Sequence, residues 1–149
     1  MRPILFVLLA SLLLRTLPAF GDGQPGGDAS PAVASEAQQE RKYQDCMSQA
    51  QSVPKQALKQ AMAWEKDGGG DAARHCVAAS YMGLKQYDDA AMELERIAET
   101  MPQVKAPIMA QLFGQAAQAW LRMGKTDRAL ADVNQGLKLA KNNVDLLVF

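Results

Sequence analysis

The chain has 149 residues, with 16 basic and 16 acidic side chains, a single histidine and two cysteines. This balanced charge excludes the basic surface on which nucleic-acid binding depends, so we predict no nucleic-acid partner. One histidine also excludes a histidine-rich metal site, and it leaves a catalytic triad with a single candidate base. We therefore predict a protein that is not an enzyme and that uses neither a metal nor a cofactor.

The first 21 residues are typical of a secretory signal peptide. Arg2 precedes an apolar run from Ile4 to Leu14, and the small residues Ala19 and Gly21 occupy the cleavage region. The run is much shorter than the roughly 20 residues of a transmembrane helix, so an uncleaved membrane anchor is the weaker alternative. We predict removal of residues 1–21 and a protein of the periplasm or the cell exterior, with no membrane attachment after cleavage.

Residues 22–35 are rich in glycine, proline, alanine, serine and aspartate. Such a composition buries too little apolar surface to offset the entropy of ordering, and it predicts a disordered linker. From about residue 36 onward, apolar residues recur at intervals of three and four, which predicts a helical domain over residues 36–149. Capping and turn residues divide it into six antiparallel helices at about 35–51, 54–66, 71–85, 88–101, 107–124 and 126–140.

The second helix of each successive pair carries the same apolar pattern. When these helices are aligned on the preceding turn, Ala57, Ala90 and Ala129 coincide, at spacings of 33 and 39 residues. A further apolar residue follows each of these alanines four positions later. Three helices with the same stripe indicate a repeat architecture, in which each helix pair buries its apolar face against the next.

The pattern within one unit resembles the tetratricopeptide repeat (TPR) family. This family places a small residue, an aromatic residue, a turn, a second small residue, a bulky apolar residue and a proline in that order. The corresponding residues of the second unit are Ala78, Tyr81, Tyr87, Ala90, Leu94 and Pro102. The corresponding residues of the third unit are Ala117, Trp120, Gly124, Ala129 and Val133. The first unit is degenerate and depends mainly on Ala57, Ala61 and Trp64.

The resemblance identifies the chain as an exported TPR protein of bacterial type. It implies an all-α fold of antiparallel helix pairs, stacked as a short right-handed solenoid of about three repeats. The repeats would span about 36–68, 71–102 and 107–141, with the start of a further helix at 143–149. The junction around "KAPIM" is about five residues longer than the family period, and we expect it to widen the angle between repeats.

The resemblance also implies a function, because the concave face of such a solenoid is its usual binding surface. We predict a non-catalytic module that binds a peptide or protein partner on this face. The implied partner-binding residues are His75, Ala79, Met82, Gln111, Gln118, Leu121 and Arg122, with Ala72 and Gly114 on the same face. The alternative is a structural spacer, or the N-terminal fragment of a longer TPR protein without a ligand of its own.

Cys46 and Cys76 are predicted to form a disulfide, because paired cysteines in an exported protein are normally oxidised. Two buried free thiols are the alternative. The disulfide would join the first predicted helix to the third and stabilise the fold by roughly 3 to 4 kcal/mol. Metal binding by Cys76 with His75 is disfavoured, because adjacent residues of a helix point about 100° apart.

The fourth predicted helix and the last six residues of the chain also lead to structural predictions. Four charged residues of the fourth helix are expected to form a solvated outer face, namely Glu93, Glu95, Arg96 and Glu99. The last six residues, Val144 to Phe149, contain five apolar side chains. We predict that they form a short seventh helix, whose apolar face either buries in a homodimer or marks a truncated longer protein.

Overall fold

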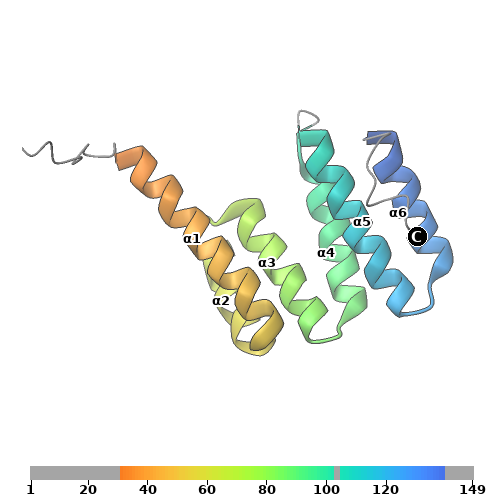
Figure 1. The fold of residues 1–149 in the computed structure, drawn as a ribbon, viewed down its shortest axis with the longest axis horizontal. Coiled ribbons are helices and arrows are strands. Elements are labelled where there is room, and N and C mark those ends of the chain that lie inside the picture. Colours follow the sequence, from red (N-terminus) through yellow and green to blue (C-terminus); the bar gives the residue numbers. More distant parts are fainter. Residues whose placement is uncertain (1–30, 103–104, 140–149) are drawn as a thin grey trace, which may run out of the picture.

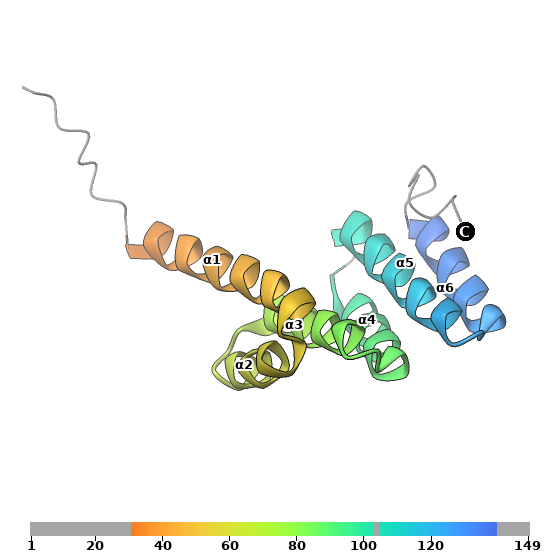
Figure 2. The same ribbon diagram turned by 60° about the horizontal axis from the view of Figure 1, so that its bottom comes forward.

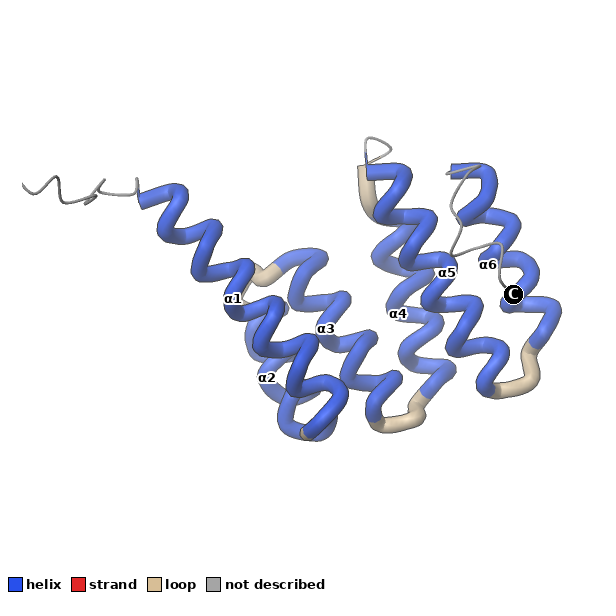
Figure 3. The backbone as a smooth tube through the Cα atoms, viewed as in Figure 1, coloured by secondary structure: helices blue, strands red, loops and turns tan. Residues whose placement is uncertain are grey.

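A computed structural model of the chain describes residues 31–102 and 105–139. Within these ranges the chain forms six helices and no strand, so the prediction of an all-α fold is confirmed (Figure 1). The helices are α1 (Pro31–Ser52), α2 (Pro54–Lys66), α3 (Gly70–Gly83), α4 (Tyr87–Thr100), α5 (Ala106–Arg122) and α6 (Thr126–Leu139). Short turns join most of them, as the tube in Figure 3 shows.

The first helix begins earlier than the sequence predicted. The predicted linker ran to residue 35, whereas α1 starts at Pro31 and so includes residues 31–35. Proline suits the first position of a helix, and the alanines that follow have the highest helix propensity. The predicted signal peptide, the rest of the predicted linker and the predicted seventh helix lie outside the described residues.

The ends of the helices follow local backbone chemistry. Helix α5 ends before Gly124, which has a φ of 71° and whose N–H donates to the carbonyl of Leu121 at 2.9 Å. Glycine takes this left-handed conformation without a steric penalty. Gly83, at the end of α3, has a different role, because a Cβ there would collide with the backbone carbonyl of Ala50. Glycine at this position lets α3 approach the end of α1 closely.

Neighbouring helices run antiparallel, and each packs against the next along the chain (Figure 1). Helix α1 also packs closely against α3, whereas α3 and α5 are not closely packed. The junction between α4 and α5 is the one that the sequence predicted to be long. Figure 2 shows α1 and α5 toward the same side of the molecule, with α3 and α4 between them.

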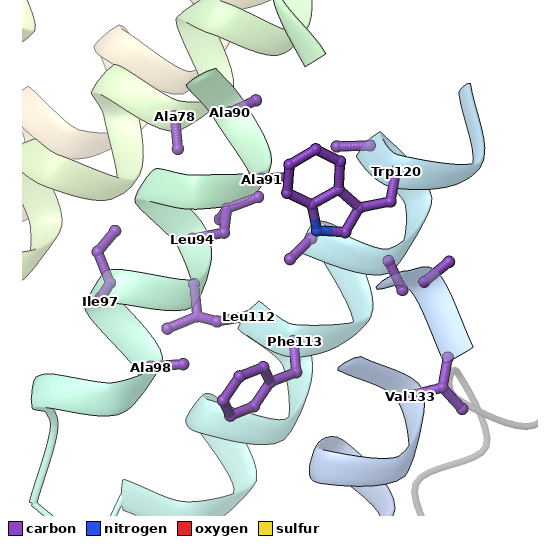
Figure 4. Close-up of a cluster of buried hydrophobic side chains, with 14 of the residues drawn as sticks. Ala78, Ala90, Ala91, Leu94, Ile97, Ala98, Leu112, Phe113, Trp120 and Val133 are labelled. Carbon is purple, nitrogen blue, oxygen red and sulfur yellow. The ribbon is translucent and has the colours of Figure 1, made fainter. Parts of the chain in front are cut away.

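The apolar core consists of two clusters of unequal size. The larger one draws its side chains from α3 to α6 and includes Leu94, Ile97, Phe113 and Trp120 (Figure 4). Trp120 is only 1% exposed. The smaller cluster lies among α1, α2 and α3 and consists of Cys46, Ala50, Ala57, Ala61, Cys76 and Val77. The aligned alanines at 57, 90 and 129 are all buried, as small residues at close helix contacts should be.

The outer face predicted for α4 needs correction at two positions. Glu93 is 13% exposed in its side chain and accepts hydrogen bonds from Arg74 and Arg96. Glu95 is half-buried and accepts a hydrogen bond of 2.6 Å from the indole of Trp120. Both carboxylates are covered because α3 packs on one side of α4 and α5 on the other. Arg96 and Glu99 are exposed, as predicted.

No helix among the described residues combines the length and the apolar character that crossing a membrane requires.

Candidate functional site

A groove of about 680 Å³ opens between α1 and α3 on one side and α5 on the other. We call it the α1/α5 groove. The end of α4 closes its base, and the groove lies where α3 and α5 are not closely packed. Its lining residues are Ser35, Glu36, Gln39, Glu40, Tyr43, Asp71, Ala72, His75, Ile97, Met101, Lys105, Ile108, Gln111, Leu112 and Gln115.

His75 links α1, α3 and α5, three of the four helices that contribute to the groove. The hydroxyl of Tyr43 lies 2.8 Å from Nδ1 of His75, and Oε1 of Gln115 lies 2.9 Å from Nε2. These distances fit a neutral imidazole that accepts from the tyrosine O–H and donates its Nε2–H to the amide oxygen. The tyrosine and imidazole rings are also stacked, with centroids 5.9 Å apart. Both ring nitrogens of His75 are therefore engaged in holding α1, α3 and α5 together.

The hydroxyl of Tyr43 is suited to donate the hydrogen bond that Nδ1 of His75 accepts. Burial raises the pKa of its phenol, and the negative charge of Glu40 raises that pKa further. The hydroxyl therefore stays protonated at neutral pH and can donate to His75. The charge of Glu40 thus acts on the half-buried phenol of Tyr43 in the groove wall.

Amide side chains give the groove hydrogen-bonding capacity. Oε1 of Gln39 accepts a hydrogen bond of 3.0 Å from the indole of Trp64, just as Oε1 of Gln115 accepts from His75. In both cases the protein uses the amide oxygen, which leaves the –NH₂ group to donate elsewhere. Gln111 lies one turn before Gln115 and is exposed. The groove thus offers amide groups on both walls.

Apolar side chains from α4 and α5 form the base beneath these amides. Ile97 and Leu112 are buried, Met101 is half-buried, and Ile108 is 47% exposed. A bound chain that covered Ile108 and Met101 would remove apolar surface from water, which favours binding.

Two of the predicted partner-binding residues line the groove, and two others are partly buried and do not line it. His75 and Gln111 come together across it. Ala79 instead packs against the smaller apolar cluster, and Met82 packs against the larger one. Both side chains are half-buried, on a helix that packs against α1, α2 and α4.

The other three predicted residues, Gln118, Leu121 and Arg122, are exposed on the second half of α5 and do not line the groove. The guanidinium of Arg122 lies 5.7 Å from the centre of the Tyr87 ring, which is a cation–π distance. Arg122 therefore contacts the start of α4 from the end of α5.

Helix α1 supplies groove residues that the sequence analysis missed, among them Glu36, Glu40 and Tyr43. The first unit matched the repeat pattern poorly, so no face of its first helix was assigned. A signal was available in the spacing, because Glu36, Glu40 and Tyr43 follow one another at intervals of four and three and so share a face. Gln115 was also missed, although it lies one turn from Gln111.

The predicted disulfide is confirmed. It joins Cys46 of α1 to Cys76 of α3, with the two Cα atoms 6.1 Å apart. Cys76 is adjacent to His75 in sequence, and Cys46 lies one turn after Tyr43. The covalent bond therefore fixes α1 against α3 beside the Tyr43–His75 contact, and it anchors one wall of the groove.

Within the described residues, no three His, Cys, Asp or Glu side chains are grouped so that they could hold a metal ion. Comparison of the chain with protein-family models, with curated proteins and with solved structures finds no match.

Proposed function

We propose that the protein is an exported, non-catalytic TPR-like module that holds an extended segment of a partner protein in the α1/α5 groove. The observation that carries the proposal is the composition of the groove, in which amide groups on both walls stand over an apolar base. Its volume of about 680 Å³ falls within the range of roughly 300 to 1,000 Å³ typical of ligand sites.

The residue types suit an extended peptide. A peptide backbone exposes N–H and C=O groups that must be hydrogen-bonded when they leave water, and glutamine side chains can both donate and accept. The apolar base then accepts side chains of the bound segment. Ala72 adds a small residue on α3, which leaves room for the backbone to approach.

The repeat assignment is part of the same proposal. Buried alanines at equivalent positions and the antiparallel order of six helices support a right-handed TPR-like solenoid of about three repeats. Export is supported by the disulfide, because such bonds persist in oxidising compartments such as the periplasm and the extracellular medium.

The proposal is tested by filling the groove. Peptides selected from a phage-displayed random library on the oxidised protein serve as probes, and fluorescence anisotropy gives their dissociation constants. We expect Gln111→Trp to weaken binding at least about tenfold, because a bulky indole would occupy the space of the bound segment. Gln111 is exposed, so the substitution should leave helicity and melting temperature unchanged.

Gln118→Trp is the matched control, because it places the same side chain at an exposed position on the same helix outside the groove. We expect wild-type affinity for this variant. Equal binding by wild type and Gln111→Trp would locate the peptide site elsewhere, and failure to select any peptide would favour the structural spacer.

A further inference from the structure

We infer that the partner segment presents a lysine or arginine side chain to the α1 wall of the groove, beside apolar side chains that rest on its base. The inference rests on the proposed function and specifies the partner. It follows from the distribution of charge along the groove, which is not uniform.

The α1 wall carries two exposed carboxylates. Glu36 and Glu40 are one turn apart, and both line the groove. Like charges at this spacing repel each other on a helix surface. Among the ion pairs of the described residues, none involves Glu36 or Glu40. A cationic side chain between them would relieve the repulsion.

The surroundings of Glu40 strengthen this point. Its Oε1 accepts a hydrogen bond of 2.7 Å from the amide of Gln44, a neutral donor that leaves the carboxylate charge in place. The same charge raises the pKa of the Tyr43 phenol, after the larger effect of burial. The charge of Glu40 therefore acts on the neighbouring Tyr43 side chain in the same wall.

The two other charged residues of the groove, Asp71 and Lys105, also favour a bound cation at the α1 wall. Asp71 is paired with Arg74 at 3.4 Å and lies in the first turn of α3, where the helix dipole also favours a carboxylate. Its charge is therefore largely satisfied. Lys105 precedes α5 on the opposite side. A bound cation is drawn to α1 and repelled from the α5 wall.

The apolar base explains why a long basic side chain fits better than an isolated cation. Lysine and arginine carry aliphatic stems that pack on apolar surface while their charged ends reach polar groups. Met101 and the exposed part of Ile108 provide such a surface in the same groove. Apolar neighbours of the basic residue would cover the rest of the base.

The inference is tested on the selected peptides. We expect the groove-dependent peptides, defined by their loss of binding to Gln111→Trp, to be enriched in a basic residue with apolar neighbours. The double variant Glu36→Gln/Glu40→Gln should bind them about three- to tenfold more weakly, since each exposed ion pair contributes little. Raising the salt concentration should weaken wild-type binding and reduce the difference between the two proteins.

Asp45→Asn/Asp67→Asn is the matched control. It removes the same charge at exposed positions that do not line the groove, Asp45 on α1 and Asp67 directly after α2, and we expect wild-type affinity. Groove-dependent peptides without basic enrichment, or peptides that bind the glutamate variant as tightly as wild type, would overturn the inference and leave the proposed function standing. Loss of affinity in the control as large as in the glutamate variant would also overturn it. Peptides insensitive to Gln111→Trp would overturn the proposed function itself.

Discussion

Helices α1 to α3 and helices α4 to α6 differ in what holds them together. Around α4 to α6, large side chains such as Leu94, Ile97 and Trp120 are almost completely buried. Around α1 to α3, the buried cluster consists of three alanines, Val77 and the two cysteines of the disulfide. Small residues permit close helix packing but bury little apolar area, so a covalent bond supplies stability where side chains supply less.

This difference bears on the groove, because its two walls come from the two regions. The α5 wall belongs to the region with the larger core. The α1 wall depends on the disulfide and on two side-chain contacts, Tyr43 with His75 and Gln39 with Trp64. The α1 wall is therefore the part of the site that changes most easily when local stability is lost.

The largest expected effect is the loss of the Trp120 side chain. Trp120→Ala should lower the free energy of unfolding by roughly 3 to 5 kcal/mol, because it leaves a cavity in the larger cluster. It also removes the hydrogen bond to Glu95 and the contacts of Lys125 and Arg128 with the ring, at 4.8 and 4.6 Å. Urea denaturation followed by circular dichroism measures the loss.

Trp64→Ala removes the corresponding large side chain from the other region. Trp64 lies on α2 and belongs to neither apolar cluster, so we expect a smaller loss of about 1 to 3 kcal/mol. Equal losses for the two tryptophans would contradict the unequal stabilisation described above.

Removal of the disulfide should affect the other region. Cys46→Ser/Cys76→Ser should lower the free energy of unfolding by roughly 3 kcal/mol, because the unfolded chain gains the entropy of an open loop. Hydrogen exchange should become faster in α1 and in the part of α3 that contacts it, with little change in α4 to α6. Uniform acceleration across all six helices would mean that the stack unfolds as one unit, without a weaker end.

Several features that depend on local sequence signals were predicted correctly, whereas several that depend on contacts between helices were not. The helices and the buried alanines at 57, 90 and 129 were predictable, because periodicity and turn residues are local signals. The disulfide was predictable from cysteine number and the expected compartment. Ala79 and Met82 were assigned to the binding face, and their partial burial depends on how α1, α2 and α4 cover α3. That arrangement is not contained in the sequence of α3.

The charged residues of α4 also show that the sequence of one helix does not reveal which neighbouring helices cover it. Glu93 and Glu95 resemble solvated residues in sequence, because a charge on an amphipathic helix is usually exposed. Glu93 is covered through Arg74 of α3, and Glu95 through Trp120 of α5. These partners lie 19 and 25 residues away, so no local pattern could reveal the pairing.

The smallest expected effect concerns Asp132, a buried carboxyl group of α6 that is 6% exposed. Its pKa is raised to about 7, mainly by burial and next by the negative charge of Glu95 and a hydrogen bond to that residue. The charge of Glu99 acts in the same direction, whereas Arg128 opposes the shift. Within the described residues, α1 to α3 contain no buried carboxyl group of this kind.

The direction of the pH effect follows from proton binding. Because the pKa of Asp132 is higher in the folded state than its ordinary value of 3.8, the folded state binds more protons between those pH values. Stability from this group is therefore fully present below about pH 4 and is lost as the pH rises through 7. Over the interval from pH 5.5 to 8 we expect a loss on the order of 1 to 2 kcal/mol.

Asp132→Asn isolates this contribution, because asparagine keeps the shape of the side chain and does not titrate. The free energy of unfolding of wild type, relative to that of the variant, should fall between pH 5.5 and 8, and Asp127→Asn at an exposed position of α6 should follow wild type. A constant difference between wild type and Asp132→Asn would mean that Asp132 is ionised in the folded protein throughout.

Hydrogen exchange then locates the effect of pH. If the difference falls as expected, exchange in α6 should be faster at pH 8 than at pH 5.5, after correction for the intrinsic rate. Exchange in α1 should be unchanged. The region with the larger apolar core would then be the one that responds to pH, because only a well-packed interior shields a carboxyl group enough to keep its proton.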